Sequence, residues 1–135
     1  MEKTLVIIKP SIPDEEFGEN IVISREYFKK IFERILRMKG FKIEKRKVEN
    51  MSTKTAEEHY AEKKEHPLFN SVILYITSGI SEILSISGEN AISEIRKIAL
   101  KMRDKYIGNN SKLYNMIHAS DSVYESEREH KIHFS

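Results

Sequence analysis

The composition of this chain limits which side chains can act as nucleophiles. It has no cysteine, which excludes thiolate catalysis, disulfides and Cys-based zinc or iron–sulfur sites. Serine, threonine, lysine, carboxylates and histidine remain. Four of the five histidines lie among charged residues, where a solvated imidazole with a pKa of about 6.5 is expected. These four are His59, His66, His130 and His133, and the fifth is His118.

His118 has different surroundings. It lies in the segment NMIHASDS (residues 115–122), after an apolar pair and before a small residue and a helix cap. Its ring is therefore expected at the edge of a core segment, beside a helix N-terminus whose free N–H groups attract anions. Neutral imidazole attacks phosphorus without first losing a proton, if an acceptor orients its other nitrogen. Glu129 is the candidate acceptor, and a core histidine bonded to a carbonyl is the structural alternative.

The elements that position these residues follow from hydrophobic spacing. Residues 4–8 predict a short buried strand, and a polar loop follows over residues 11–20. Apolar residues at helical spacing then predict a helix between the cap Ser24 and the terminal Gly40. Residues 41–48 alternate, which predicts a strand with one wet face.

The middle of the chain predicts a helix and a hairpin. Ser52 or Thr53 caps a charged helix that runs to about residue 64, before His66-Pro67. Residues 72–77 and 80–87 are predicted to pair as a hairpin around the turn Ser78-Gly79.

The last third predicts two helices. The first follows Gly88-Glu89-Asn90 and includes residues 91–102, and a polar stretch over 105–112 comes after it. Asp121 or Ser122 caps the second, and Ile132 and Phe134 suggest a final edge strand. This interleaving, with antiparallel pairing, predicts an α+β sandwich with helices on one face of a sheet.

Length and charge exclude several classes. The 135 residues suit a single domain over residues 1–135. The net charge of +2 is too balanced for a dedicated nucleic-acid surface, and no apolar run is long enough for a leader or membrane span. We expect a soluble, cytoplasmic protein that has no protein-borne metal site.

Three separated segments resemble the nucleoside diphosphate kinase family. They are TLVIIKP (4–10), AEEHYAEKKEHPLF (56–69), and NMIHASDS (115–122) followed by ERE (127–129). The segments TSG (77–79) and GENAI (88–92) also match the family's middle. All of them keep the family order and span nearly the whole chain, which is far more specific than a lone Asn-x-x-His.

The resemblance implies a four-stranded, ferredoxin-like fold and a ping-pong reaction through phosphorylated His118. ATP would phosphorylate His118, and a nucleoside diphosphate would then take the phosphoryl group. Glu129 and Ser120 would orient the imidazole, and Tyr60 would lie next to it. Mg²⁺ would arrive with the nucleotide, whose phosphates it neutralises.

The resemblance also implies the nucleotide contacts. Lys9 would bind phosphate and the sugar hydroxyl, and Asn115 would hold the sugar's 3′-hydroxyl. Leu68 would cover the base, in place of a family aromatic. Arg96 and Arg103 would bind phosphates, with Lys105 as the rival of Arg103.

Only seven positions separate Arg96 from Arg103, where the family has a long loop that carries much of its subunit interface. We therefore expect a homodimer rather than a larger assembly. Two other functions stay open: an inactive nucleotide-binding regulator, and a nucleic-acid-binding ferredoxin-like module. The second is disfavoured because no run of exposed aromatics of the RNA-binding kind is present.

Overall fold

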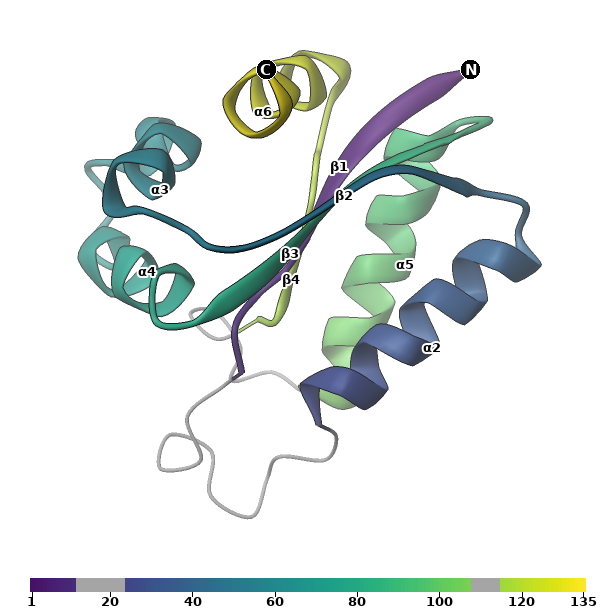
Figure 1. Ribbon diagram of the computed structural model, residues 1–135, viewed down its shortest axis with the longest axis horizontal. Helices are drawn as coiled ribbons and strands as arrows, with labels where there is room; N and C mark the ends of the chain where they lie inside the picture. Colours follow the sequence, from purple (N-terminus) through teal and green to yellow (C-terminus); the bar gives the residue numbers. More distant parts are fainter. Residues whose placement is uncertain (12–23, 108–114) are drawn as a thin grey trace.

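A four-stranded antiparallel sheet forms the centre of the fold (Figure 1). The structure is a computed structural model that describes residues 1–11, 24–107 and 115–135. The strands lie in the order β2-β3-β1-β4, which confirms the predicted ferredoxin-like α+β class. They are β1 (Glu2–Ile8), β2 (Lys42–Asn50), β3 (Ile80–Gly88) and β4 (Ile117–Ala119).

Helices cover both faces of this sheet, so the prediction that they lie on one face is wrong. One face carries α2 (Arg25–Met38) and α5 (Ala91–Tyr106) (Figure 1). The other carries the short helices of the middle of the chain and the last helix. These are α3 (Thr53–His59), the 3₁₀ turn η2 (Ala61–Lys63), α4 (Phe69–Ile76) and α6 (Val123–Phe134).

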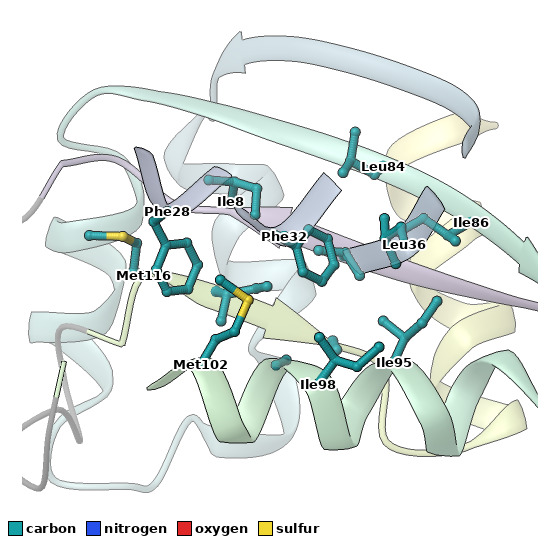
Figure 2. Close-up of a cluster of buried hydrophobic side chains, with 14 of the residues drawn as sticks. Ile8, Phe28, Phe32, Leu36, Leu84, Ile86, Ile95, Ile98, Met102 and Met116 are labelled. Atoms are coloured by element: carbon teal, nitrogen blue, oxygen red, sulfur yellow. The ribbon is translucent and has the colours of Figure 1, made fainter. Parts of the chain in front are cut away.

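The central strand β1 explains why two helical layers are needed. Its residues Leu5 to Ile8 are all fully buried, and successive side chains of a strand point to opposite faces. Val6 and Ile8 join the cluster under α2 and α5, where Phe28 packs with them (Figure 2). Leu5 and Ile7 join a second cluster under α3 and α4. A strand that is apolar on both faces requires cover on both.

Serine caps fix where three helices begin. The Ser24 hydroxyl accepts from the backbone N–H of Tyr27 at 3.2 Å, which confirms the predicted start of α2. Gly40 follows the end of that helix with φ of +80°, a conformation that glycine adopts without strain. Ser52 and Ser122 cap α3 and α6 in the same way, which decides both of the open alternatives.

The predicted hairpin is wrong, because its first arm is helix α4. Residues 72–77 are rich in β-branched side chains, yet a short apolar run does not by itself distinguish a strand from a buried helix. In the structure Ile73 and Ile76 of α4 pack into the second cluster, and packing overrides propensity. The strand β3 pairs with β1 and β2 instead.

The end of the chain also differs from its prediction. Ile132 and Phe134 belong to α6 rather than to an edge strand. The buried stripe of α6 consists of Ser126, Glu129 and His133, and a polar stripe gives little apolar periodicity. The three-residue strand β4 was not predicted. The loop predicted over 11–20 and the polar stretch over 105–112 lie largely outside the described residues.

Candidate active site

A cavity of about 530 Å³ collects the residues singled out from the sequence. Its lining comes from the end of β1, the segment from α3 to α4, helix α5, strand β4 and helix α6. Ser120 does not line the cavity and is fully buried behind Glu129. The other eight predicted site residues all line it: Lys9, Tyr60, Leu68, Arg96, Arg103, Asn115, His118 and Glu129.

Strand β4 aims His118 into this cavity. Ile117 and Ala119 on either side of it are buried in the cluster under α2 and α5. Because side chains alternate along a strand, His118 points to the other face, toward α6. Its backbone is fixed opposite Ile7 in the antiparallel ladder with β1. The nucleophile candidate is therefore mounted on the sheet.

One carboxylate orients the His118 ring. The Nε2 atom of His118 lies 2.9 Å from Oε1 of Glu129, and the Ser120 hydroxyl donates to the same oxygen at 2.6 Å. Ser120 is itself held by the backbone N–H of Leu5, which donates to its hydroxyl at 3.1 Å. A carboxylate accepts the ring proton at Nε2, so the lone pair is at Nδ1. Within the described residues Nδ1 has no hydrogen-bond partner.

The electrostatics keep His118 neutral. Burial lowers the pKa of His118 well below its usual range, and the positive charges of Lys9 and Arg103 lower it further. Burial raises the pKa of Glu129, while the Ser120 hydrogen bond and the charge of Arg128 oppose that rise. At neutral pH the ring is an uncharged imidazole that donates from Nε2. That is the form able to attack an electrophile.

Lys9 and Asn115 meet at the end of β1. The Lys9 Nζ donates to Oδ1 of Asn115 at 2.7 Å, and Lys9 is only 4 % exposed. Burial, followed by the charges of Arg103 and Lys63, lowers the pKa of Lys9 to about 7. A phosphate would supply the negative charge that this buried ammonium lacks.

A residue in an uncommon backbone conformation connects this corner to β4. Met116 has φ of +64°, and its carbonyl accepts from the backbone N–H of Lys9 at 2.8 Å. The conformation costs on the order of 1–3 kcal/mol for a side chain other than glycine, so its surroundings must hold it. It turns the chain between Asn115 and His118, two of the residues that line the cavity.

Two arginines on α5 hold the carbonyls beside His118. Arg96 donates to the Ala119 carbonyl at 3.2 Å, and Arg103 donates to the Ile117 carbonyl at 3.0 Å. They are seven residues apart on one continuous helix, which places them on the same face. Arg103 lines the cavity, and its rival Lys105 is not among the lining residues. The Nζ of Lys105 lies 5.3 Å from the centroid of the Tyr106 ring.

Tyr60 contributes a buried phenol. Within the described residues its hydroxyl has no hydrogen-bond partner, and burial raises its pKa. The Lys9 Nζ lies 5.7 Å from the centroid of its ring. The ring in contact with His118 is that of His59, at 4.7 Å between centroids, and His59 also contacts Tyr60 at 4.7 Å.

The prediction of four surface histidines is wrong for two of them. His59 and His133 are each 3 % exposed, and the 2.9 Å contact between His59 Nδ1 and His133 Nε2 joins them. His66 is exposed as predicted, while His130 is half-buried and bonded to Ser85 at 2.8 Å. The spacing of His133, four residues after Glu129 on a helix, was the available signal.

Arg128 was also missed. Its guanidinium donates to the carbonyls of Glu58 at 3.0 Å and His59 at 2.8 Å, at the end of α3. Cations are favourable at a helix C-terminus, and this one joins α6 to α3. Arg128 lies in the segment ERE (127–129) that resembles the family, but no role was predicted for it.

Within the described residues, His59, His118 and Glu129 are the one group of three possible metal ligands whose ligand atoms lie within 4.8 Å of one another. The Glu129 Oε1 atom already accepts from Ser120 and His118, so we assign the group to hydrogen bonding. No helix among the described residues is long and apolar enough to cross a bilayer.

Comparison with known proteins identifies the family of this chain. The sequence profile of the family described as "Nucleoside diphosphate kinase" matches residues 2–135. The chain belongs to the nucleoside diphosphate kinase family. The family's general reaction transfers a terminal phosphate between nucleotides by a ping-pong mechanism through a phosphohistidine, and this confirms the predicted phosphotransferase activity.

Two named relatives and a solved structure support the same family. The nucleoside diphosphate kinase of Thermococcus kodakarensis is 36 % identical over 146 aligned positions, which cover 99 % of this chain and 77 % of that one. The enzyme of Thermobifida fusca is 33 % identical, with 99 % and 97 % covered. The crystal structure of the Aquifex aeolicus nucleoside diphosphate kinase superposes with a TM-score of 0.75 at 27 % identity, covering 99 % of this chain and 95 % of that one.

Proposed function

We propose that His118 is the residue that carries the phosphoryl group in this nucleoside diphosphate kinase. The observation that carries the assignment is the 2.9 Å contact between His118 Nε2 and Glu129. It uses one ring nitrogen to orient the imidazole and leaves the Nδ1 lone pair as the nucleophile. Residues 1–135 act as one catalytic domain in this proposal.

The covalent step follows from that geometry. The Nδ1 lone pair of His118 attacks the γ-phosphorus of the triphosphate, and the bond from phosphorus to the β,γ-bridging oxygen breaks. The bridging oxygen leaves with the electron pair as part of the diphosphate. The phosphorylated ring keeps its Nε2 proton and is cationic, so the Glu129 carboxylate stabilises it. A second diphosphate reverses the step and takes the phosphoryl group.

Three cations neutralise the phosphate oxygens. Lys9, Arg96 and Arg103 line the cavity, and phosphoryl transfer depends mainly on positioning and on such neutralisation. Asn115 binds the sugar, and the Tyr60 hydroxyl, which lacks a protein partner, is available to the substrate. Mg²⁺ would enter this cavity with the nucleotide, because the groups proposed to meet phosphate are cationic. Bound there, it would shield phosphate charge.

The base lies on Leu68 at the start of α4. This side chain is half-buried and offers apolar surface without a π-face or a hydrogen-bonding group. Stacking on an aromatic ring is worth roughly 1–3 kcal/mol per base in single-strand binders, and that contribution is absent at this position. We expect several diphosphates to be accepted at similar rates.

Assembly and location complete the proposal. Arg96 and Arg103 on one unbroken helix leave no loop between them to build a larger assembly. The edge strand β2 and helix α2 are available for a homodimer, and light scattering tests that state. We place the enzyme in the cytoplasm.

The exchange reaction tests the proposal. The protein is incubated with ATP and an equimolar mixture of ADP, GDP, CDP and UDP, and the triphosphate products are quantified. We expect all of the corresponding triphosphates from wild type, within about tenfold of one another, and none from His118→Asn. A folded His118→Asn protein with exchange activity would refute the assignment. A wild type that binds nucleotides without exchange would indicate the inactive regulator instead.

A further inference from the structure

The catalytic carboxylate has a second histidine on its far side. Glu129 uses Oε1 for His118 and Ser120, and its Oε2 lies 3.9 Å from Nε2 of His59. His59 is 3 % exposed, and its other nitrogen, Nδ1, lies 2.9 Å from Nε2 of His133. The groups therefore form a buried sequence from His133 through His59 and Glu129 to the reacting ring.

His59 and His133 are both neutral. The tautomer of each ring therefore decides which of its nitrogens donates a hydrogen bond and which accepts one. Burial lowers the pKa of His59 well below its usual range, and the positive charges of Lys9 and Arg128 lower it further. Burial also lowers the pKa of His133 to about 4, against the opposing charge of Glu129.

Two proton arrangements satisfy the contact between His59 and His133. In the first, His59 donates from Nδ1, so its Nε2 lone pair faces the Glu129 carboxylate and repels it. His133 would then carry its proton on Nδ1. That atom is buried and has no partner within the described residues. A buried N–H group without an acceptor is rare and costly.

The second arrangement avoids both penalties. His133 donates from Nε2 to Nδ1 of His59, and His59 then presents its Nε2–H to the Glu129 carboxylate. Among the described residues the Nδ1 lone pair of His133 stays unpaired, and a buried acceptor without a partner is less costly than a buried donor. The 3.9 Å between His59 Nε2 and Glu129 Oε2 is longer than a hydrogen bond, but the attraction between the N–H dipole and the carboxylate is favourable. The positive end of the His59 N–H dipole then faces the oxygen that His118 leaves free.

We propose that His133 is a positioning residue for phosphoryl transfer, because it holds His59 in the tautomer whose Nε2–H faces Glu129. The carboxylate then has hydrogen bonds at Oε1 and an N–H dipole facing Oε2, and both favour the orientation in which it meets Nε2 of His118. The orientation of Glu129 matters most in the phosphoenzyme, in which the His118 ring is cationic. This inference rests on the proposed role of His118.

The histidine tautomers can be measured directly in wild type. Long-range ¹H–¹⁵N correlation spectra of ¹⁵N-histidine-labelled protein distinguish the two forms of each ring. We expect His59 and His133 both to carry their protons on Nε2 at neutral pH. A proton on Nδ1 of His59 would overturn the inference without any variant being made.

Variants at position 133 separate the hydrogen bond from mere space filling. His133→Gln keeps an N–H donor for His59, whereas His133→Leu fills the space without one. We expect His133→Leu to slow single-turnover phosphorylation by about fivefold, with unchanged nucleotide dissociation constants, and His133→Gln to restore the rate. His130→Gln on the same helix serves as a control and should leave the rate unchanged.

The outcomes distinguish this inference from the assignment of His118. A wild-type rate and tautomer in His133→Leu, or a rate as slow in His133→Gln as in His133→Leu, would refute the role of His133. Phosphorylation of a residue other than His118 in wild type would instead refute the underlying assignment. If His133→Leu does not fold, the wild-type tautomer decides.

Discussion

The two walls of the cavity are built differently. The wall formed by β4 and α6 carries His118 and Glu129, with Ser120 buried behind them, and hydrogen bonds join these side chains to one another and to β1. The wall between α3 and α4 carries Leu68 and the exposed Lys63, on short helical pieces. In the proposed reaction, phosphoryl transfer therefore takes place on the sheet, where hydrogen bonds fix the geometry. The proposed base contact lies on short helical segments instead.

The largest effect is expected on the sheet wall, at the nucleophile. His118→Asn removes the lone pair that attacks phosphorus while keeping a polar side chain of smaller size. We expect exchange activity to fall by at least about a thousandfold, because the covalent route is lost. Circular dichroism and thermal unfolding check that the fold survives. Activity within tenfold of wild type would show that the sheet wall does not supply the nucleophile.

The next effect is expected at the carboxylate that orients the ring. Glu129→Gln keeps the shape but replaces the negative charge that stabilises the cationic ring. We expect single-turnover phosphorylation to slow by about a hundredfold, with little change in nucleotide binding. Glu127→Gln, an exposed residue of the same helix, is the matched control. Equal rates in both variants would show that the charge of Glu129 has no part in the step.

Much of the sheet wall could be predicted from sequence, because its residues lie in short, specific segments. His118, Ser120 and Glu129 were expected together, and the structure brings them together. His59 and His133 were not expected to be buried. Their burial depends on how α3 packs on α6, and no local pattern states that. Helix α4 was mistaken for a strand because eight apolar-rich residues suit either state until the tertiary partner is known.

A smaller effect, the uptake of a proton when a nucleotide binds, tests the role of Lys9. In the empty cavity the pKa of Lys9 is about 7, and the charge of a bound phosphate raises it. Between those two pKa values, binding takes up a proton, so affinity falls as the pH rises above about 7. Calorimetry of ADP binding at pH 8 in buffers of different ionisation enthalpy should show uptake approaching one proton.

The control for proton uptake is a lysine outside the cavity. Lys9→Gln should abolish the uptake, and Lys101→Gln on the exposed side of α5 should retain it. Uptake that persists in Lys9→Gln would assign the proton to another group. No uptake in wild type would show that Lys9 is already charged in the empty cavity.

The smallest effect is expected on the α3–α4 wall. Leu68→Phe adds a π-face under the base without touching the groups that hold phosphate. We expect purine diphosphates to bind about threefold to tenfold more tightly, pyrimidines less so, and the phosphorylation rate to stay the same. A change in the rate with unchanged affinity would show that the two walls are not independent.

The central claim is that Nδ1 of His118 receives the phosphoryl group while Nε2 stays bonded to Glu129. The most direct measurement is ³¹P nuclear magnetic resonance of the phosphoenzyme formed with ATP, followed by mass spectrometric mapping of the modified residue. The account predicts one acid-labile phosphohistidine, at His118, with phosphorus on Nδ1. Phosphorus on Nε2, or on any other residue, would contradict it.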